Sequence, residues 1–419
     1  MSRKNEPRPW FTERRLRAHG LILAVSLWLI YLWVLCSPGL RDRNGNLKGT
    51  DFLHFYTLGT LALKHRGGEL YSMDAQAELA AKRVPDASGL RYLPLYPPQV
   101  SMLFAPLARL SYSWALGVWW GFTGAVYGIC CYRIWRVCPN LKSRGVTVTL
   151  LGLANPGFFH LIAWGQTSAL ALACFTLMFF ALRGNRDLLA GLFFGCLIFK
   201  PQLALAPLVV FIATGAWKLL GGAVISAAGQ LSAGVLYFGT DPFRSWLRTM
   251  WNVRSLLPLL EPKLYQTHCL RTFWSMLTPA QTIAFFFYLA SSVAVLAMTI
   301  GISKRTNAAS LSLRFPALVL STVLVAPHLT VYDLVLLVPA LLLSADWLIG
   351  EAHLVRASGI AWALYLVYLL PLVGPLARWT HLQLSVIAMV ALLVLMTTAS
   401  VQSRISPVGE LDTHGGFSV

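Results

Sequence analysis

The sequence predicts an all-α polytopic membrane protein, a chain that crosses the bilayer many times. Of its 419 residues, 57% are hydrophobic and only 12% are charged, and the mean hydropathy is +0.63. So little polar surface cannot cover a soluble globule of this size. The polar residues instead separate a series of long apolar runs, which is the pattern of membrane-spanning helices.

The first apolar run covers residues 21–36. The basic residues before it are Arg3, Lys4, Arg8, Arg14, Arg15 and Arg17. The run reaches the length of a membrane-spanning helix, about 20 residues, when residues 18–20 are counted with it. No small-residue cleavage site follows, so we expect an anchor and not a removed signal peptide.

Dense basic turns predict the orientation of the chain. They are the N-terminal tail and residues 133–144, 183–186 and 304–305. Short loops rich in lysine and arginine stay in the cytoplasm, so both ends of the chain are expected there. The apolar runs predict about twelve transmembrane helices: 19–37, 112–135, 145–163, 166–182, 188–199, 202–215, 219–238, 276–302, 311–326, 331–348, 357–374 and 381–401.

Two of these helices, 188–199 and 202–215, are too short to cross alone. Twelve residues of helix rise only about 18 Å, and the bilayer core is roughly 30 Å thick. One kinked helix over 188–215 is the local alternative, but it would place two basic turns on opposite sides of the membrane. We therefore expect two short helices that meet at Lys200 and Pro201 and line a cavity, because lysine does not face lipid without a partner.

Two long loops, 38–111 and 239–275, fall on the outer side of this topology. The first carries an amphipathic stretch, which predicts a helix lying along the membrane surface. Its face repeats at helical spacing through Asp51, His54, Phe55 and Leu58. We expect residues 1–405 to form one integral membrane domain and residues 406–419 to form a short flexible tail.

Charge and cysteine usage exclude other classes of protein. The net charge is +18, but the basic residues lie in short clusters between apolar runs and not on one face. The positive-inside bias explains this pattern, so no nucleic-acid partner is expected. The 7 cysteines form no CxxC pair and mostly fall within apolar runs, which predicts buried apolar side chains without a disulfide framework or a zinc site.

Polar residues near the predicted helix ends gather on the outer side. Such residues cost free energy inside a membrane unless they have a partner or a function. The inner loops fixed the orientation for most of them, so their placement on one side indicates a shared site. These residues are Asp51, His54, Tyr96, Gln166, Lys200, His268, Arg271, His328, Tyr332 and Asp333.

Five stretches in succession resemble the signatures of glycosyltransferase family 87, whose members have the GT-C fold. They are "DFLHFYTLGTLALKHRGGELY", "YPPQVSMLFAPLARL", "GQTSAL", "GLFFGCLIFKPQ" and "APHLTVYDLVLLVPALLL", between residues 51 and 343. Their order is more specific than any single stretch. In one departure, "QTHCLRTFW" stands where the family often has an Asn-Gln-Ser-like stretch, and this departure concerns the acceptor more than the reaction.

The resemblance implies a GT-C-like bundle similar to the polyprenyl-phosphate-mannose-dependent mannosyltransferases. It implies transfer of a hexose, with mannose as the first choice, from a polyprenyl-phosphate sugar to a lipid or glycan acceptor. The active site would face the extracytoplasmic side of the plasma membrane, among membrane lipids. The family's catalytic acid lies on the first outer loop, at the position of Asp51 in this sequence.

The chemistry of such a transfer assigns a role to each candidate. Asp51 would be the general base that takes the proton of the acceptor hydroxyl. The departing phosphate needs fixed cations, for which Lys200, Arg271 and His328 are candidates, and we count His328 as catalytic. No nucleotide diphosphate leaves and no DxD pair is present, so neither a metal nor another cofactor is expected. The remaining substrate-binding candidates are His54, Tyr96, Gln166, His268, Tyr332 and Asp333.

The same residues have structural alternatives. Asp51 and Asp333 can cap the helices that follow them. Gln166 can close a hairpin, Lys200 can pair with a structural carboxylate, and Arg271 can be an interfacial anchor. His54 can simply be a neighbour on a helix face.

Two other classes of function fit the pattern. A transporter or flippase can also have twelve helices with a broken one at midspan, although the two halves of this chain show no matching interruption. A pseudoenzyme would bind the lipid-linked sugar without transferring it. Acceptor-dependent release of polyprenyl phosphate distinguishes the three classes.

Overall fold

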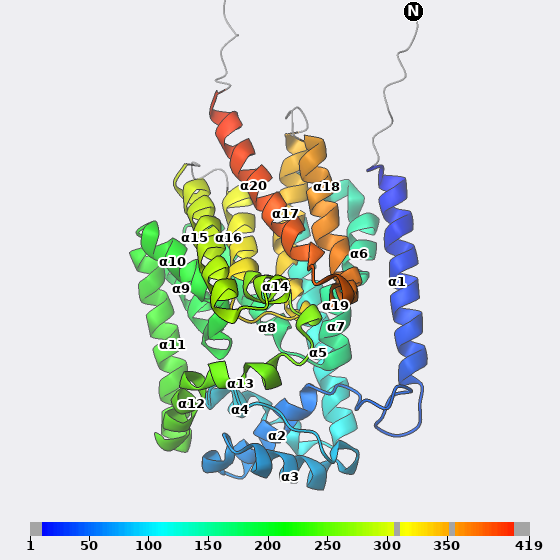
Figure 1. Cartoon of the computed structure of the whole chain (residues 1–419), viewed down its shortest axis with the longest axis vertical. Helices are drawn as coiled ribbons and strands as arrows, with labels where there is room; N and C mark the ends of the chain where they lie inside the picture. Colours follow the sequence, from blue (N-terminus) through cyan, green and yellow to red (C-terminus); the bar gives the residue numbers. More distant parts are fainter. Residues whose placement is uncertain (1–10, 306–310, 352–356, 406–419) are drawn as a thin grey trace, which may run out of the picture.

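Helices make up nearly all the regular structure of the chain. The computed structural model describes residues 11–305, 311–351 and 357–405, so the expected tail at 406–419 lies outside the described residues. Within these ranges there is no strand, only two isolated bridges, between Arg41 and Leu47 and between Thr267 and Thr330. The start of α1 and the end of α20 lie at the same end of the molecule (Figure 1), as any even number of crossings requires.

Six helices in the described ranges are long and apolar enough to cross a membrane. Many of their large apolar side chains are exposed, among them Trp114 and Leu236, which is the surface expected to face lipid. The protein is therefore an all-α, multi-pass membrane protein. These spans are α1 (Glu13–Leu35), α5 (Tyr112–Arg136), α11 (Trp217–Phe238), α15 (Gln281–Arg305), the 3-10 helix Val331–Leu336 with α17 (Leu337–Gly350), and α18 (Ala357–Leu369) with the 3-10 helix Leu370–Leu376 and α19 (Ala377–Thr380).

The other predicted runs also contain helices, which do not count among these six spans. They are α6 (Gly145–Leu153), α7 (Pro156–Trp164), α8 (Ser168–Arg183), α9 (Asp187–Gly195), α10 (Leu205–Ala213), α16 (Leu311–Val325) and α20 (Leu384–Ile405). A break at Asn155 bends the helices on its two sides by 46°, because Asn155 caps α7 through the Phe158 amide and Pro156 begins the new helix. Bent helices of this kind can share one crossing, so length alone does not establish twelve crossings.

The chain is broken at Lys200, as expected from the sequence. A 3-10 helix, Cys196–Phe199, follows α9, and a second one, Pro201–Leu203, precedes α10. Lys200 between them has φ −133° and ψ 69°, which lies outside the helical region. The two-helix interpretation is therefore confirmed, and the single kinked helix is wrong.

A close helix pair holds this break in place. A Cβ atom built on Gly191 of α9 would lie 1.9 Å from the carbonyl oxygen of Leu219 in α11, so only glycine permits this approach. α9 and α11 therefore pack almost backbone to backbone along one side of the molecule, and the end of α9 carries Lys200 into the interior.

The first long connection, residues 36–111, forms a layer of short helices at the end of the bundle opposite the termini (Figure 1). It contains the 3-10 helices Gly67–Glu69, Pro85–Ala87 and Leu107–Arg109, and the α-helices α2 (Phe52–Leu63), α3 (Met73–Arg83) and α4 (Gln99–Phe104). The expectation that α2 is an amphipathic helix with one exposed face is wrong, because residues 52–62 are all buried. α3, α4 and α5 pack around α2, and a Cβ on Gly59 would lie 2.4 Å from the Phe104 carbonyl oxygen.

The second long connection follows α11 and carries the amphipathic character that we expected of α2. It consists of α12 (Asp241–Trp251), α13 (Val253–Leu260), the 3-10 helix Leu264–Gln266 and α14 (Leu270–Leu277). On α12, Trp246 is buried and its indole donates to the Leu95 carbonyl oxygen at 3.0 Å, whereas Trp251 is 89% exposed. The first and second connections are therefore fastened to each other.

Candidate active site

Asp51 lies at the start of α2, and its carboxylate is held from another helix. Its backbone amide donates to the Trp164 carbonyl oxygen at 3.0 Å, and its Oδ2 accepts from Gln166 Nε2 at 2.7 Å. The side chain makes no capping hydrogen bond to α2, so the helix-cap alternative has no support in the geometry. Asp51 follows α1, the first of the six candidate spans, and precedes the other five, so it lies outside all of them.

The environment of Asp51 changes its acidity. Burial raises the pKa of Asp51 to about 6, although the hydrogen bond from Gln166 and the positive charge of Lys200 oppose this rise. A carboxylate with a pKa near 6 is ionised at neutral pH and is a stronger base than an ordinary aspartate. This acidity suits proton abstraction from a substrate.

The turn between α7 and α8 presents Gln166 to Asp51. Gly165 ends α7 in the left-handed region at φ 70°, and a Cβ there would lie 2.7 Å from Cβ of Phe52. Trp119 donates to the Gly165 carbonyl oxygen at 2.9 Å and fixes the turn. Gln166 therefore closes a hairpin and also contacts Asp51, so its structural and functional interpretations are compatible.

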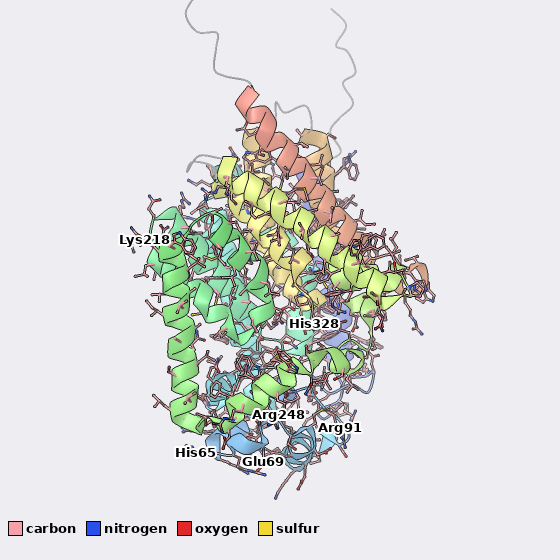
Figure 2. The ribbon with its side chains drawn as sticks, turned by 60° about the vertical axis from the view of Figure 1, so that its left-hand side comes forward. His65, Glu69, Arg91, Lys218, Arg248 and His328 are labelled. Carbon is pink, nitrogen blue, oxygen red and sulfur yellow. The ribbon has the colours of Figure 1, made fainter. Side chains whose placement is uncertain are left out.

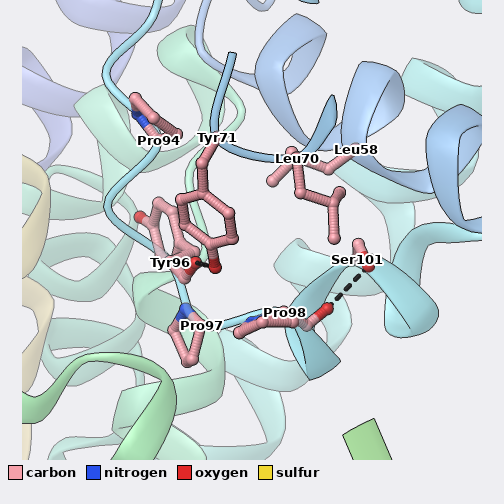
Figure 3. A pocket seen from close by; sticks show the side chains of 8 residues that line it. All are labelled: Leu58, Leu70, Tyr71, Pro94, Tyr96, Pro97, Pro98 and Ser101. Atoms are coloured by element: carbon pink, nitrogen blue, oxygen red, sulfur yellow. Dashed lines mark hydrogen bonds between the residues drawn. The ribbon is translucent and has the colours of Figure 1, made fainter. Parts of the chain in front are cut away.

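Tyr96 and His54 lie beside this carboxylate. The Tyr96 hydroxyl is 3.5 Å from Oε1 of Gln166, and the buried ring of His54 lies 6.0 Å from the Tyr96 ring, centroid to centroid. Tyr71 donates to the Tyr96 carbonyl oxygen, as Figure 3 shows. The drawn side chains line a small cavity: Leu58, Leu70, Tyr71, Pro94, Tyr96, Pro97, Pro98 and Ser101.

Lys200 is buried in an ion pair. Only 3% of the residue is exposed, and its Nζ donates to Asp333 Oδ1 at 2.7 Å and to Ser168 Oγ at 2.9 Å. The ammonium also lies 5.2 Å from the centroid of the Tyr332 ring. The lysine thus has the oppositely charged partner that a buried ammonium in an apolar helix bundle requires.

Asp333 combines a capping role with this ion pair. Its other oxygen, Oδ2, lies 3.4 Å from the amide of Thr330 in a capping box at the start of the 3-10 helix Val331–Leu336. Tyr332 next to it packs edge-on against Trp164, whose carbonyl binds the Asp51 amide. The Lys200 pair and Asp51 therefore belong to one connected site.

A second group of charges contains a residue that the sequence did not single out. Glu261, directly after α13, binds His328 Nδ1 through Oε1 at 2.6 Å and Arg271 through Oε2. Burial acts to raise the pKa of Glu261, but the hydrogen bond from His328 and the charge of Arg271 outweigh it and lower the pKa below the ordinary value. Glu261 was missed because it stands alone among apolar residues, and its partners are 10 and 67 positions away.

His268 lies apart from both groups. It is 1% exposed, its Nδ1 is 2.7 Å from Ser385 Oγ, and its amide donates to the Leu329 carbonyl oxygen at 2.9 Å. These contacts fasten the segment before α14 to α20 and to the turn before α17. Its expected contact with substrate therefore has no counterpart in the geometry of the site.

The site lies in the middle of the molecule. Figure 2 shows His328 at mid-height, with Lys218 toward one end and His65, Glu69 and Arg91 toward the other. Among the residues that the structure describes, no three His, Cys, Asp or Glu side chains gather as a metal site would require. The described site comprises one half-buried carboxylate, two buried ionic groups and several tyrosines.

The fold and the buried charged groups assign the chain to the broad class of multi-pass membrane proteins with a polar site inside the helix bundle. The chain belongs to glycosyltransferase family 87, because the profile of that family matches residues 95–327, which is more than half of the chain. The match contains Gln166, Lys200 and Arg271, begins after Asp51 and ends one residue before His328. Searches of curated proteins and of solved structures found no match.

Proposed function

We propose that this glycosyltransferase moves a hexose, first of all mannose, from a polyprenyl-phosphate sugar to a hydroxyl group of a lipid or glycan acceptor. The reaction would take place at the extracytoplasmic face of the plasma membrane. The observation that carries the proposal is the half-buried carboxylate of Asp51, which Gln166 orients and whose pKa burial raises. Membership of family 87 favours transfer over transport, the alternative open from the sequence.

In the proposed reaction Asp51 is the general base. The acceptor oxygen attacks the anomeric carbon, its proton passes to Asp51, and the bond from that carbon to the phosphate oxygen breaks. Gln166 occupies Oδ2, which leaves Oδ1 for the incoming hydroxyl. A positioned base of this kind contributes roughly 10²- to 10⁴-fold to the rate.

The departing polyprenyl phosphate gains negative charge, which needs a cation in a fixed position. Arg271 and His328 share one carboxylate, so this group carries a net positive charge when His328 is protonated. The charge of Lys200 is balanced by Asp333, so in this proposal Lys200 influences the phosphate electrostatically from within its ion pair. The proposal therefore gives Arg271 and His328 the direct contacts.

The test is Asp51→Asn in the full-length protein, assayed in membranes with radiolabelled polyprenyl-phosphate hexoses and extracted lipid acceptors. Asparagine keeps the shape and can still accept the bond from Gln166, but it cannot take a proton. We expect normal folding and donor binding with a loss of about 10²- to 10⁴-fold in transfer. Transfer near the parental rate would remove Asp51 from the role of base.

Asp74→Asn is the matched control for this test. Asp74 lies in the same connection, on α3, and its exposed side chain pairs with Arg91 at the surface. Exposed ion pairs contribute little, so this variant should transfer at the parental rate. Release of polyprenyl phosphate must also depend on acceptor, because a transporter or a pseudoenzyme would release none.

The proposed location is tested by labelling in intact cells. In a background without reactive cysteines, Ser88→Cys should react with an impermeant thiol reagent and Asn185→Cys should not, because the first connection is expected outside and the turn after α8 inside. Equal labelling of the two positions would contradict both the topology and the side assigned to the site.

A further inference from the structure

Among the described residues, Glu261 is the one carboxylate in the site that binds two basic side chains at once. It is 7% exposed, and its two oxygens separately contact His328 and Arg271. An ionised carboxylate only accepts hydrogen bonds, so Nδ1 of His328 must carry the hydrogen of the shared bond. Nε2 is then the ring nitrogen left to meet a substrate.

The backbone on either side of His328 is held by hydrogen bonds that do not involve its ring. Arg271 Nε donates to the Pro327 carbonyl oxygen, and the amide of His268 donates to the Leu329 carbonyl oxygen at 2.9 Å. These bonds fix the position of the histidine but leave the rotation of its ring free. Glu261 provides the contact that selects one ring orientation.

We propose that Glu261 is a positioning residue for the departing phosphate. It holds the ring of His328 and the guanidinium of Arg271 so that the remaining N–H groups of both point toward one anion. This inference rests on the proposed function, since it takes the phosphate of the donor as that anion. The carboxylate itself does not touch the substrate.

The direction in which phosphate binding changes distinguishes a positioning role of Glu261 from a purely electrostatic one. Glu261 contributes a negative charge, and removing a negative charge near an anion site by itself strengthens anion binding. Loss of orientation weakens it, because charge-assisted hydrogen bonds to phosphate depend on geometry. Glu261→Gln keeps the size of the side chain and removes the charge, so the two roles predict changes in opposite directions.

The experiment measures binding of polyprenyl phosphate, and the KM for its hexose derivative, with the full-length protein in lipid nanodiscs. We expect Glu261→Gln to weaken both by about ten- to a hundredfold, by analogy with the loss of a residue that orients a metal-ligating histidine. The KM for acceptor should change little. Glu69→Gln is the control, because Glu69 also pairs with an arginine, Arg66, but at the surface.

A double-mutant cycle tests whether Glu261 acts through His328. If it does, Glu261→Gln should weaken binding less in the His328→Gln background than in the parental protein, because only the orientation of Arg271 is then left to lose. Full additivity of the two losses, or equal or tighter phosphate binding in Glu261→Gln, would overturn the proposal. Glu261→Asp provides the same comparison if Glu261→Gln does not fold, since the shorter carboxylate cannot reach both partners and should also weaken binding.

The proposal and the function on which it rests fail in different ways. A parental protein that does not bind polyprenyl phosphate removes the proposed donor and this inference together. A parental protein that binds it normally, with a Glu261→Gln variant that binds it equally well, overturns the role of Glu261 alone.

Discussion

The two buried ionic groups of the site differ in charge balance. Lys200 and Asp333 match one to one between a break in the bundle and a capped 3-10 helix. Glu261 is shared by Arg271 and His328 on the edge of the second connection. A matched pair holds helices together, whereas a group with two basic side chains for one carboxylate can bind an anion when His328 is protonated. Burial alone therefore does not identify an anion-binding group. The ratio of basic side chains to carboxylates in the group is more informative.

Among the substitutions that test the difference between the Lys200–Asp333 pair and the Glu261 group, we expect the largest loss of stability and donor binding at Lys200. Lys200→Ala leaves Asp333 buried without its partner, which costs about 3–5 kcal/mol of folding free energy, and donor binding should weaken strongly. Lys200→Arg keeps the charge but disturbs a compact site, so it should lose less stability. Thermal unfolding and donor binding in detergent measure both.

Lys218→Ala is the control for Lys200, because Lys218 is exposed at the start of α11. Donor binding at the parental level in Lys200→Ala would exclude Lys200 from phosphate recognition. Unfolding at the parental temperature would contradict the structural role assigned to the pair.

A smaller effect is expected from pH, through Asp51. Burial raises the pKa of Asp51 to about 6, and only the ionised carboxylate can act as a base. Transfer should therefore rise with pH through about 6 and level off above it, with about a tenfold difference between pH 5 and pH 7. Initial rates at saturating donor measure this profile. A profile that is flat over this interval would show that ionisation of Asp51 does not limit the reaction.

The smallest effect is expected from Arg271→Lys. Lysine keeps the charge, but its ammonium cannot reproduce the fork that contacts both Glu261 and the Pro327 carbonyl oxygen. We expect the KM for donor to rise about fivefold, equivalent to roughly 1 kcal/mol, with little change in kcat. Arg248→Lys, at an exposed position on α12, should behave as the parental protein. A KM unchanged in Arg271→Lys would reduce Arg271 to an interfacial anchor.

Local features of the fold could be predicted from the sequence. Apolar runs gave the positions of the helices, because the length of an apolar segment is a property of the segment itself. The break at Lys200 was predictable for the same reason, since Pro201 cannot continue a helix ladder. The burial of α2 was not, because its pattern does not reveal that Phe104 approaches Gly59 closely enough to cover its remaining face.

In the site, too, local features could be predicted from the sequence and contacts between distant segments could not. Polar residues in apolar surroundings identified Asp51, Gln166 and Lys200 as members of a site, and the geometry joins them. Partners distant in the chain were missed: Glu261 binds a histidine 67 residues away, and His268 is held by a serine 117 residues away. Such pairs are decided by the packing of whole helices, which a single sequence does not encode in any short segment.

Gly165 has a further consequence for how this protein tolerates change. A Cβ atom at this position would lie 2.7 Å from Cβ of Phe52, the residue that follows the proposed base, so the alignment of Asp51 with Gln166 depends on a residue without a side chain. Adding one methyl group there would wedge α2 away from the turn while every ionisable group remained intact. The alignment of Asp51 and Gln166 thus requires that Gly165 has no side chain. A search for inactivating variants that is confined to polar residues would overlook this position.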